Sequence, residues 1–312
     1  MAILKYIIPI LTAVLLSGCY EEFTPGVDTT PVLCVNSLIT AGRPIEIEVS
    51  RTWLFSDQKS EASHNVTDAK VTIFANDKAV GSDYIPEEGD RIRIVAESAI
   101  YGSATAEVTV PRATPIGDVV VTPVDTYVWA DGISFNLNIE MDVNDPADVQ
   151  NYYKFGYGTS GEDAPLHIGN FEYDLEPIFK EHIGAFETVI DSGDETEFTF
   201  FSDRQFSGRK YTLHLNFTNN YFSVESDDFD ESMFEYGLNL YLTTVSSSYY
   251  YRAVNKWHLD ETLIGDMSDL GFADPKWGYS NVSTGAGVVA AQSSAVYKVN
   301  LKDFLQSTIN NQ

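Results

Sequence analysis

The chain has few cysteines and few basic residues, and each shortage excludes a class of protein. Only two cysteines, Cys19 and Cys34, occur among 312 residues, which excludes a disulfide-rich secreted scaffold. Lysine and arginine together number 19 against 46 aspartates and glutamates, so the formal net charge is −27. This charge repels phosphate backbones, and we therefore expect no nucleic-acid partner. It equally disfavours a polybasic contact with a membrane surface.

Long hydrophobic runs are also scarce. The apolar run at residues 6–16 follows Lys5 and is shorter than the roughly 20 residues that a membrane-spanning helix needs. A short apolar run behind a positive charge is typical of a secretory signal peptide. We therefore assign residues 1–18 to a signal peptide, with Ser17 and Gly18 as the small residues before a cleavage between Gly18 and Cys19.

Cys19 closes the segment Leu16-Ser17-Gly18-Cys19, which resembles a bacterial lipobox. The resemblance implies that the Cys19 thiol receives a diacylglyceryl group and becomes the first residue of the mature protein. Acyl chains on Cys19 would then hold the protein to a membrane. The alternative is an ordinary signal peptide followed by an incidental cysteine.

Residues 19–31 read as a lipidated, flexible tether rich in turn formers. The acidic pair Glu21-Glu22 resembles a Bacteroidota signal for export to the outer leaflet of the outer membrane, facing the cell exterior; incidental charge on a solvated tether is the alternative. Asp28-Thr29-Thr30 resembles the short Bacteroidota O-glycosylation site, with Thr29 as the acceptor.

The remaining sequence alternates apolar and polar residues with the period of β-strands, as in residues 135–139, 211–217 and 238–243. Many such runs, separated by Gly, Pro, Asn and Asp, predict an all-β protein with antiparallel sheets. Asn76-Asp77 between two short runs predicts a hairpin turn. Cys34 lies in an apolar run, where we expect a buried small side chain.

Pro111 and Pro115 mark a linker between two domains, because proline cannot donate to a sheet ladder. Residues 32–111 have the size of an immunoglobulin-like β-sandwich. Residues 116–306 predict a larger antiparallel β-sandwich or barrel with one short helix. The pattern places that helix at residues 246–259, capped by serine, and Pro146 predicts a helical turn at residues 145–149.

The order of several segments resembles a Bacteroidota lipoprotein family known as a domain of unknown function, DUF4249. Two of them read DPADVQNYY at residues 145–153 and WGYSNVSTGAGV at residues 277–288. The others are residues 31–39, 68–73, 108–111, 201–208 and 247–252. The resemblance implies an accessory of TonB-dependent outer-membrane transporters, and it carries no catalytic residue onto this chain.

Residue patterns that support chemistry are weak, and we assign no catalytic residue, metal site or cofactor. No two histidines stand four apart as a zinc motif requires; they are His64, His167, His182, His214 and His258. We expect His214 to face solvent on a strand. The segment Gly285-Ala286-Gly287 lacks the lysine of a phosphate loop, and a tight turn or bulge is the better interpretation.

Acidic clusters and paired aromatics leave alternatives open. The clusters at residues 191–195 and 225–231 could bind calcium or form solvated loops. The pairs at residues 152–153 and 221–222, with the triplet at residues 249–251, could expose aromatics for a glycan or protein, or could be covered on both sides.

These observations favour a non-enzymatic surface lipoprotein that binds a nutrient or a transporter partner at the outer membrane. Two alternatives belong to other classes. One is a surface hydrolase of glycan or peptide, which would need convergent carboxylates in a pocket. The other is an adhesin-like structural lipoprotein, which would present a large flat apolar patch.

Overall fold

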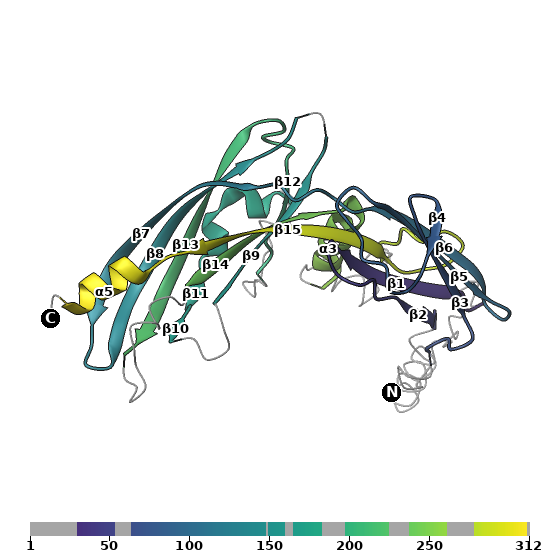
Figure 1. Ribbon diagram of the computed structural model, residues 1–312, viewed down its shortest axis with the longest axis horizontal. Coiled ribbons are helices and arrows are strands. Elements are labelled where there is room, and N and C mark those ends of the chain that lie inside the picture. Colours follow the sequence, from purple (N-terminus) through teal and green to yellow (C-terminus); the bar gives the residue numbers. More distant parts are fainter. Residues whose placement is uncertain are drawn as a thin grey trace, which may run out of the picture.

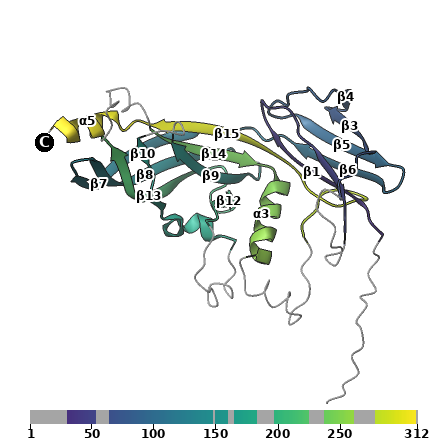
Figure 2. The same ribbon diagram turned by 90° about the horizontal axis from the view of Figure 1, so that it is seen from below.

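The computed structural model describes residues 30–53, 64–147, 149–159, 165–182, 197–224, 237–260 and 278–310. Gly18, Cys19, Thr29 and the acidic clusters at residues 191–195 and 225–231 lie outside these ranges. The chain forms two lobes joined along one long strand, β15 (Figures 1 and 2). Within the described ranges, no helix has the length and apolar character needed to span a bilayer.

The small lobe packs two sheets against each other, because several of its strands bury alternate residues. One sheet has the order β4-β3-β5-β6, and it faces β1, β2 and the first residues of β15. The strands are β1 (Leu33–Thr40), β2 (Glu48–Arg51), β3 (Lys70–Ala75), β4 (Lys78–Val80), β5 (Arg91–Ser98) and β6 (Gly102–Thr109).

The large lobe is a second two-layer structure. The order β10-β13-β8-β7, with β11 also paired to β13, forms one layer, and β12-β9-β14-β15 forms the other. The strands are β7 (Ile116–Val128), β8 (Gly132–Asn144), β9 (Tyr152–Thr159), β10 (Leu166–His167), β11 (Asn170–Phe171), β12 (Phe200–Ser202), β13 (Lys210–Ser223), β14 (Leu238–Val245) and β15 (Val289–Val299).

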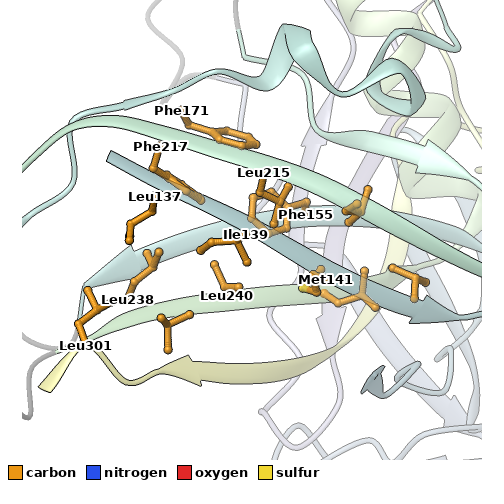
Figure 3. Close-up of a cluster of buried hydrophobic side chains, with 14 of the residues drawn as sticks. Leu137, Ile139, Met141, Phe155, Phe171, Leu215, Phe217, Leu238, Leu240 and Leu301 are labelled. Carbon is orange, nitrogen blue, oxygen red and sulfur yellow. The ribbon is translucent and has the colours of Figure 1, made fainter. Parts of the chain in front are cut away.

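The core of the large lobe lies between these layers (Figure 3). Leu137 and Ile139 of β8, Leu215 and Phe217 of β13, and Leu240 of β14 all point into it. They are alternate residues of their strands, so the period-two pattern seen in the sequence is the inward face of each sheet. The 3₁₀ helices η2 (Tyr173–Leu175) and η3 (Pro177–Lys180) connect β11 to the residues before β12.

β15 belongs to both lobes. From Val289 to Gln292 it pairs in parallel with β1, and from Gln292 to Val299 it pairs antiparallel with β14. Val282, Val289 and Ala291 are buried in the small-lobe core, although they follow residue 116 in the chain and the sequence pattern placed them with the larger domain. The division of the chain at residues 111–115 therefore does not separate the two cores completely.

The mainly β architecture is confirmed, with two corrections. The described strands close no barrel, so the barrel alternative is wrong for this part of the chain. Within the described ranges two α-helices occur instead of one: α3 (Ser247–Asp260), which was predicted, and α5 (Lys302–Asn310), which was not. The immunoglobulin-like character of the small lobe stays a prediction.

The sequence contained a signal for α5. Leu301, Phe304, Leu305 and Ile309 recur at helical spacing. Asn300 also caps the first turn, because its Oδ1 accepts the amide of Lys302 at 2.9 Å.

Three predictions about local features can also be compared with the structure. Asn76 and Asp77 have φ angles of 51° and 67° and join β3 to β4, so the hairpin turn is confirmed. The helical turn at residues 145–149 is wrong: none of its described residues is helical. Cys34 is free but only half-buried, and Asn36 donates to its Sγ at 3.6 Å.

Candidate functional site

A groove of about 790 Å³ lies where the two lobes meet. One wall is the end of β6 and the linker, residues 107–112. The opposite side is the loop before β9, with Pro146 and Val149, and Tyr152 at the start of β9; the floor is residues 244–248 at the junction of β14 and α3. Tyr279 and Asn281 complete the lining. With Gly89, the groove thus takes its lining from both lobes and from five separated regions of the chain.

Serine hydroxyls fix the start of α3 at this groove. The Ser246 Oγ accepts the amides of Tyr249 at 3.3 Å and Ala291 at 3.0 Å, which caps the helix and ties it to β15. The Ser248 Oγ donates to the carbonyl of Val289 at 2.9 Å. Because β15 holds the first turn by these bonds, the groove floor is preformed.

Most of the paired aromatics are covered. Tyr152, Tyr153 and Tyr250 are all buried, and the rings of Tyr152 on β9 and Tyr250 on α3 lie 4.7 Å apart. Tyr251 is the exception, with 45% of its surface exposed, and its hydroxyl lies 3.0 Å from that of Tyr152. Burial raises the pKa of Tyr152 and of Tyr250, so both phenols are neutral hydrogen-bonding groups.

Two buried carboxylates brace the wall of the groove. Asp145 accepts the Tyr153 hydroxyl at 2.5 Å, the amide of Gly208 at 2.8 Å and the Asn151 Nδ2 at 3.1 Å. Asp203 accepts the amide of Asn151 at 2.8 Å, and its burial raises the pKa of that carboxyl. These bonds join residues 145–153 to the turn at residues 203–208, so the two carboxylates stabilise the fold between these segments.

Two further carboxylates act in the same way. Glu181 accepts the amide of Ser202 at 2.5 Å and the Tyr250 hydroxyl at 2.9 Å, which links η3 and β12 to α3. Burial raises the pKa of Glu181. Glu176 is completely buried and accepts the Tyr211 hydroxyl at 2.6 Å and the amide of His214 at 2.7 Å.

A second hollow of about 590 Å³ lies on the side of α3 that faces β1 and β2. Leu38, Ile47 and Tyr249 provide apolar surface there, and Glu48 and Arg252 provide charge. α3 therefore stands between two depressions that both carry charges of both signs, Glu107 and Arg112 in the first and Glu48 and Arg252 in the second.

Metal ligands do not gather in the described part of the chain, where no group of three or more His, Cys, Asp or Glu residues could hold an ion. The side chain of His214 is 63% exposed, which confirms that it faces solvent. Gly285 and Gly287 lie against β1: a Cβ on Gly287 would stand 2.2 Å from the carbonyl oxygen of Val35. This close approach explains the glycines by backbone packing against β1, where Ala286 is bridged in parallel to Cys34; a turn or bulge in a hairpin stays a prediction.

The lipid anchor Cys19, the cleavage site at Gly18 and the acceptor Thr29 lie outside the described residues and remain predictions. The groove itself was not predicted. A signal for it was present, however, because segments 108–111, 145–153, 247–252 and 277–288, which carried the family resemblance, all contribute to its lining.

Comparison of the chain with curated proteins found no match, and comparison with solved structures found none either. The family model described as "Domain of unknown function (DUF4249)" matches residues 20–298. That match covers both lobes, α3 and every segment that lines the groove. The chain therefore belongs to the DUF4249 family.

Proposed function

We propose that this protein is a non-enzymatic lipoprotein of the outer-membrane surface, anchored through Cys19, that binds a TonB-dependent transporter or its nutrient in the groove between the lobes. The observation that carries the proposal is the convergence of four family segments on that groove. These segments lie far apart in the chain, and the fold brings them to one surface.

The chemistry of the groove supports binding. Its lining offers neutral hydrogen-bonding groups on Gln150, Ser247 and Tyr279, and its charged residues are Glu107 and Arg112. Neutral polar groups beside aromatic rings suit an extended peptide or a glycan. The buried carboxylates of Asp145 and Asp203 accept hydrogen bonds from groups within the protein.

Val149 offers the sharpest test, because 59% of its surface is exposed within the groove. Val149→Arg should place a charge in the groove without disturbing the core. Val120→Arg is the matched control, since Val120 is 55% exposed on β7 and does not line the groove. The acylated protein would be used to pull partners from detergent-solubilised outer membrane for mass spectrometry.

A transporter recovered in near-stoichiometric amount with the wild type and Val120→Arg, and lost with Val149→Arg, is the expected result. Equal recovery with both variants would contradict the groove as the contact. Recovery of the lipoprotein alone would contradict a stable transporter complex, and glycan and peptide binding to the groove would then be measured directly.

The anchor has its own test. Cys19→Ala removes the thiol that would be acylated, so the protein should move from the membrane fraction to the soluble fraction. Cys34→Ala is the matched control, because Cys34 is the second cysteine of the chain and lies in β1. Membrane retention of Cys19→Ala would contradict lipid anchoring.

A further inference from the structure

The turn between β7 and β8 carries three consecutive apolar residues in open solvent. Tyr127 is 62% exposed, Val128 40% and Trp129 57%. Adjacent residues on a strand point to opposite faces of the sheet. Because both Tyr127 and Val128 are exposed, this end of β7 is uncovered on both faces, although Ile133 opposite Val128 on β8 is buried. This aromatic turn lies at the end of the large lobe away from the small lobe (Figure 1).

The aromatic turn is held in one shape. Its turn closes with the Trp129 amide donating to the Gly132 carbonyl at 2.8 Å, and the Trp129 Nε1 donates to the Ser134 Oγ at 2.9 Å. The Val224 amide donates to the Asp131 carbonyl at 3.0 Å, so the residue that follows β13 holds the turn from the side. A preformed apolar tip with its indole N–H satisfied has little conformational entropy to lose on contact.

Pairing with another strand does not explain these exposed residues. β7 is an edge strand, but Pro123 lies within it and its register shifts between Ile116 and Val119 and again between Val124 and Tyr127. Proline and bulges obstruct the addition of a strand to an edge. A partner at this tip must therefore use the side chains of the turn and needs no backbone ladder.

The negative charge around the aromatic turn excludes electrostatic attraction to an anionic partner. Asp125 and Asp131 flank the turn and are exposed, and the chain as a whole is strongly acidic. Attraction to an anionic surface therefore cannot drive a contact here. Tyr and Trp rings, in contrast, settle in the headgroup region of a bilayer, where an apolar body and a polar edge are both satisfied.

We propose that the aromatic turn is a second contact with the lipid bilayer, in which Tyr127, Val128 and Trp129 lie among the headgroups. The inference rests on the proposed anchor at Cys19. The segment between Cys19 and Thr30 can span at most about 40 Å, at ~3.6 Å per residue, so the body stays near the surface. In Figure 1 the aromatic turn and β2 lie along the same lower edge of the arched molecule.

The test uses the acylated full chain in phosphatidylcholine vesicles whose acyl chains are brominated, with unbrominated vesicles as the reference. Bromine quenches tryptophan emission only on close approach. The wild type should be quenched, and Trp129→Phe should lose the bromine-dependent part of the quenching. Trp53→Phe is the matched control, because Trp53 is 47% exposed in the small lobe; it should retain that part.

A second variant keeps the reporter. Tyr127→Ser with Val128→Ser removes apolar surface from exposed positions and leaves Trp129, so quenching of Trp129 should fall without loss of the fold. Quenching that is absent, or unchanged in Trp129→Phe, while the protein floats with the vesicles would overturn the bilayer contact and leave the anchor standing. Failure to float would overturn both.

The pull-down separates the two proposals further. If the Tyr127→Ser, Val128→Ser variant lost a protein partner that Val149→Arg retained, and no quenching occurred, the aromatic turn would be a protein contact and the lipid proposal would be wrong. If Val149→Arg alone lost the transporter while quenching matched expectation, both proposals would stand.

Discussion

The two lobes of this protein are both two-layer β structures, but they fill their cores differently. The large lobe buries aromatic rings between its sheets, among them Phe135, Phe155, Phe217 and Phe222. In the described part of the small lobe, the buried cluster consists of Leu, Ile, Val and Ala, and Tyr84 and Tyr101 pack only at its margin. Large rings gain more stability per residue from burial, and small side chains let backbones approach closely.

The small lobe also needs a segment from the C-terminal part of the chain to form its core. In the small lobe, Gly285 lies close to Ala104 in a segment that runs parallel to β1, and the backbone of Ala286 bonds to Leu33 and Val35. The parallel pairing of β1 with β15 joins residues about 250 positions apart, as in the bond from the Val288 amide to Asn36. The small lobe is therefore complete only when the C-terminal segment is in place, and such long-range pairing forms slowly.

The largest expected effect comes from the aromatic core. Phe217→Ala should lower the free energy of unfolding of the large lobe by about 3–5 kcal/mol, because it leaves a cavity among packed rings. Ile94→Val at the centre of the small lobe should cost only about 0.5–1.5 kcal/mol. Denaturant unfolding with hydrogen exchange would assign each loss to its lobe. Equal losses would show that the two cores do not differ as their side chains suggest.

The second effect concerns the joint between the lobes. Gly287 has a φ of +106°, and an added Cβ would meet three backbone atoms of Val35. Gly287→Ala should cost about 2–3 kcal/mol, the range of a strained backbone position, and should speed hydrogen exchange in β5 more than in β13. Gly42→Ala is the control, because Gly42 has a φ of +75° with open space around it; it should cost about 1 kcal/mol. Equal costs would contradict the close contact.

The third effect is one of pH, in the large lobe. Burial raises the pKa of Glu181 in the folded state, although its hydrogen bonds from Tyr250 and Ser202 oppose the shift. The folded protein therefore holds this proton more tightly than the unfolded chain, and the contribution of Glu181 to stability falls as pH rises from its ordinary pKa through the raised value.

Glu181→Gln keeps acceptors for Ser202 and Tyr250 and removes the ionisation. Its stability relative to wild type should therefore increase with pH across that window, as measured by thermal unfolding at a series of pH values. Tyr250→Phe removes one hydrogen bond to the carboxylate and should cost about 1–2 kcal/mol above the window. A constant difference between Glu181→Gln and wild type would show that Glu181 titrates as an exposed acid.

The smallest effect belongs to the small lobe. Asp77→Gly creates an Asn-Gly turn, the preferred sequence for the left-handed angles at residues 76 and 77. It also removes the surface ion pair of Asp77 with Arg91, whose side chains are 67% and 46% exposed. Since such pairs contribute at most about 1 kcal/mol, the net change should lie within ±0.5 kcal/mol by denaturant unfolding. A larger loss of unfolding free energy would show that the ion pair of Asp77 with Arg91 contributes more than an ordinary surface pair.

Several features of the fold were open to prediction because they depend on neighbours in the chain. Serine caps and an aromatic face identified α3, and Asn76-Asp77 identified its hairpin. α5 was also within reach, from the spacing of Phe304, Leu305 and Ile309. The helical turn predicted at residues 145–149 was wrong. An Asp-Pro pair can begin a helix, but here Asp145 lies in a loop and accepts hydrogen bonds from Asn151, Tyr153 and Gly208.

Period-two patterning was thus sufficient for the β class and for the inward residues of strands such as β1, β5 and β13, since both follow from the pleat of a single strand. The sharing of β15 between the lobes, the groove between them and the bracing role of the buried acids depend on contacts between distant segments. Pairing over about 250 residues is set by the register of packed sheets and by the space left at Gly285 and Gly287, which no local pattern encodes.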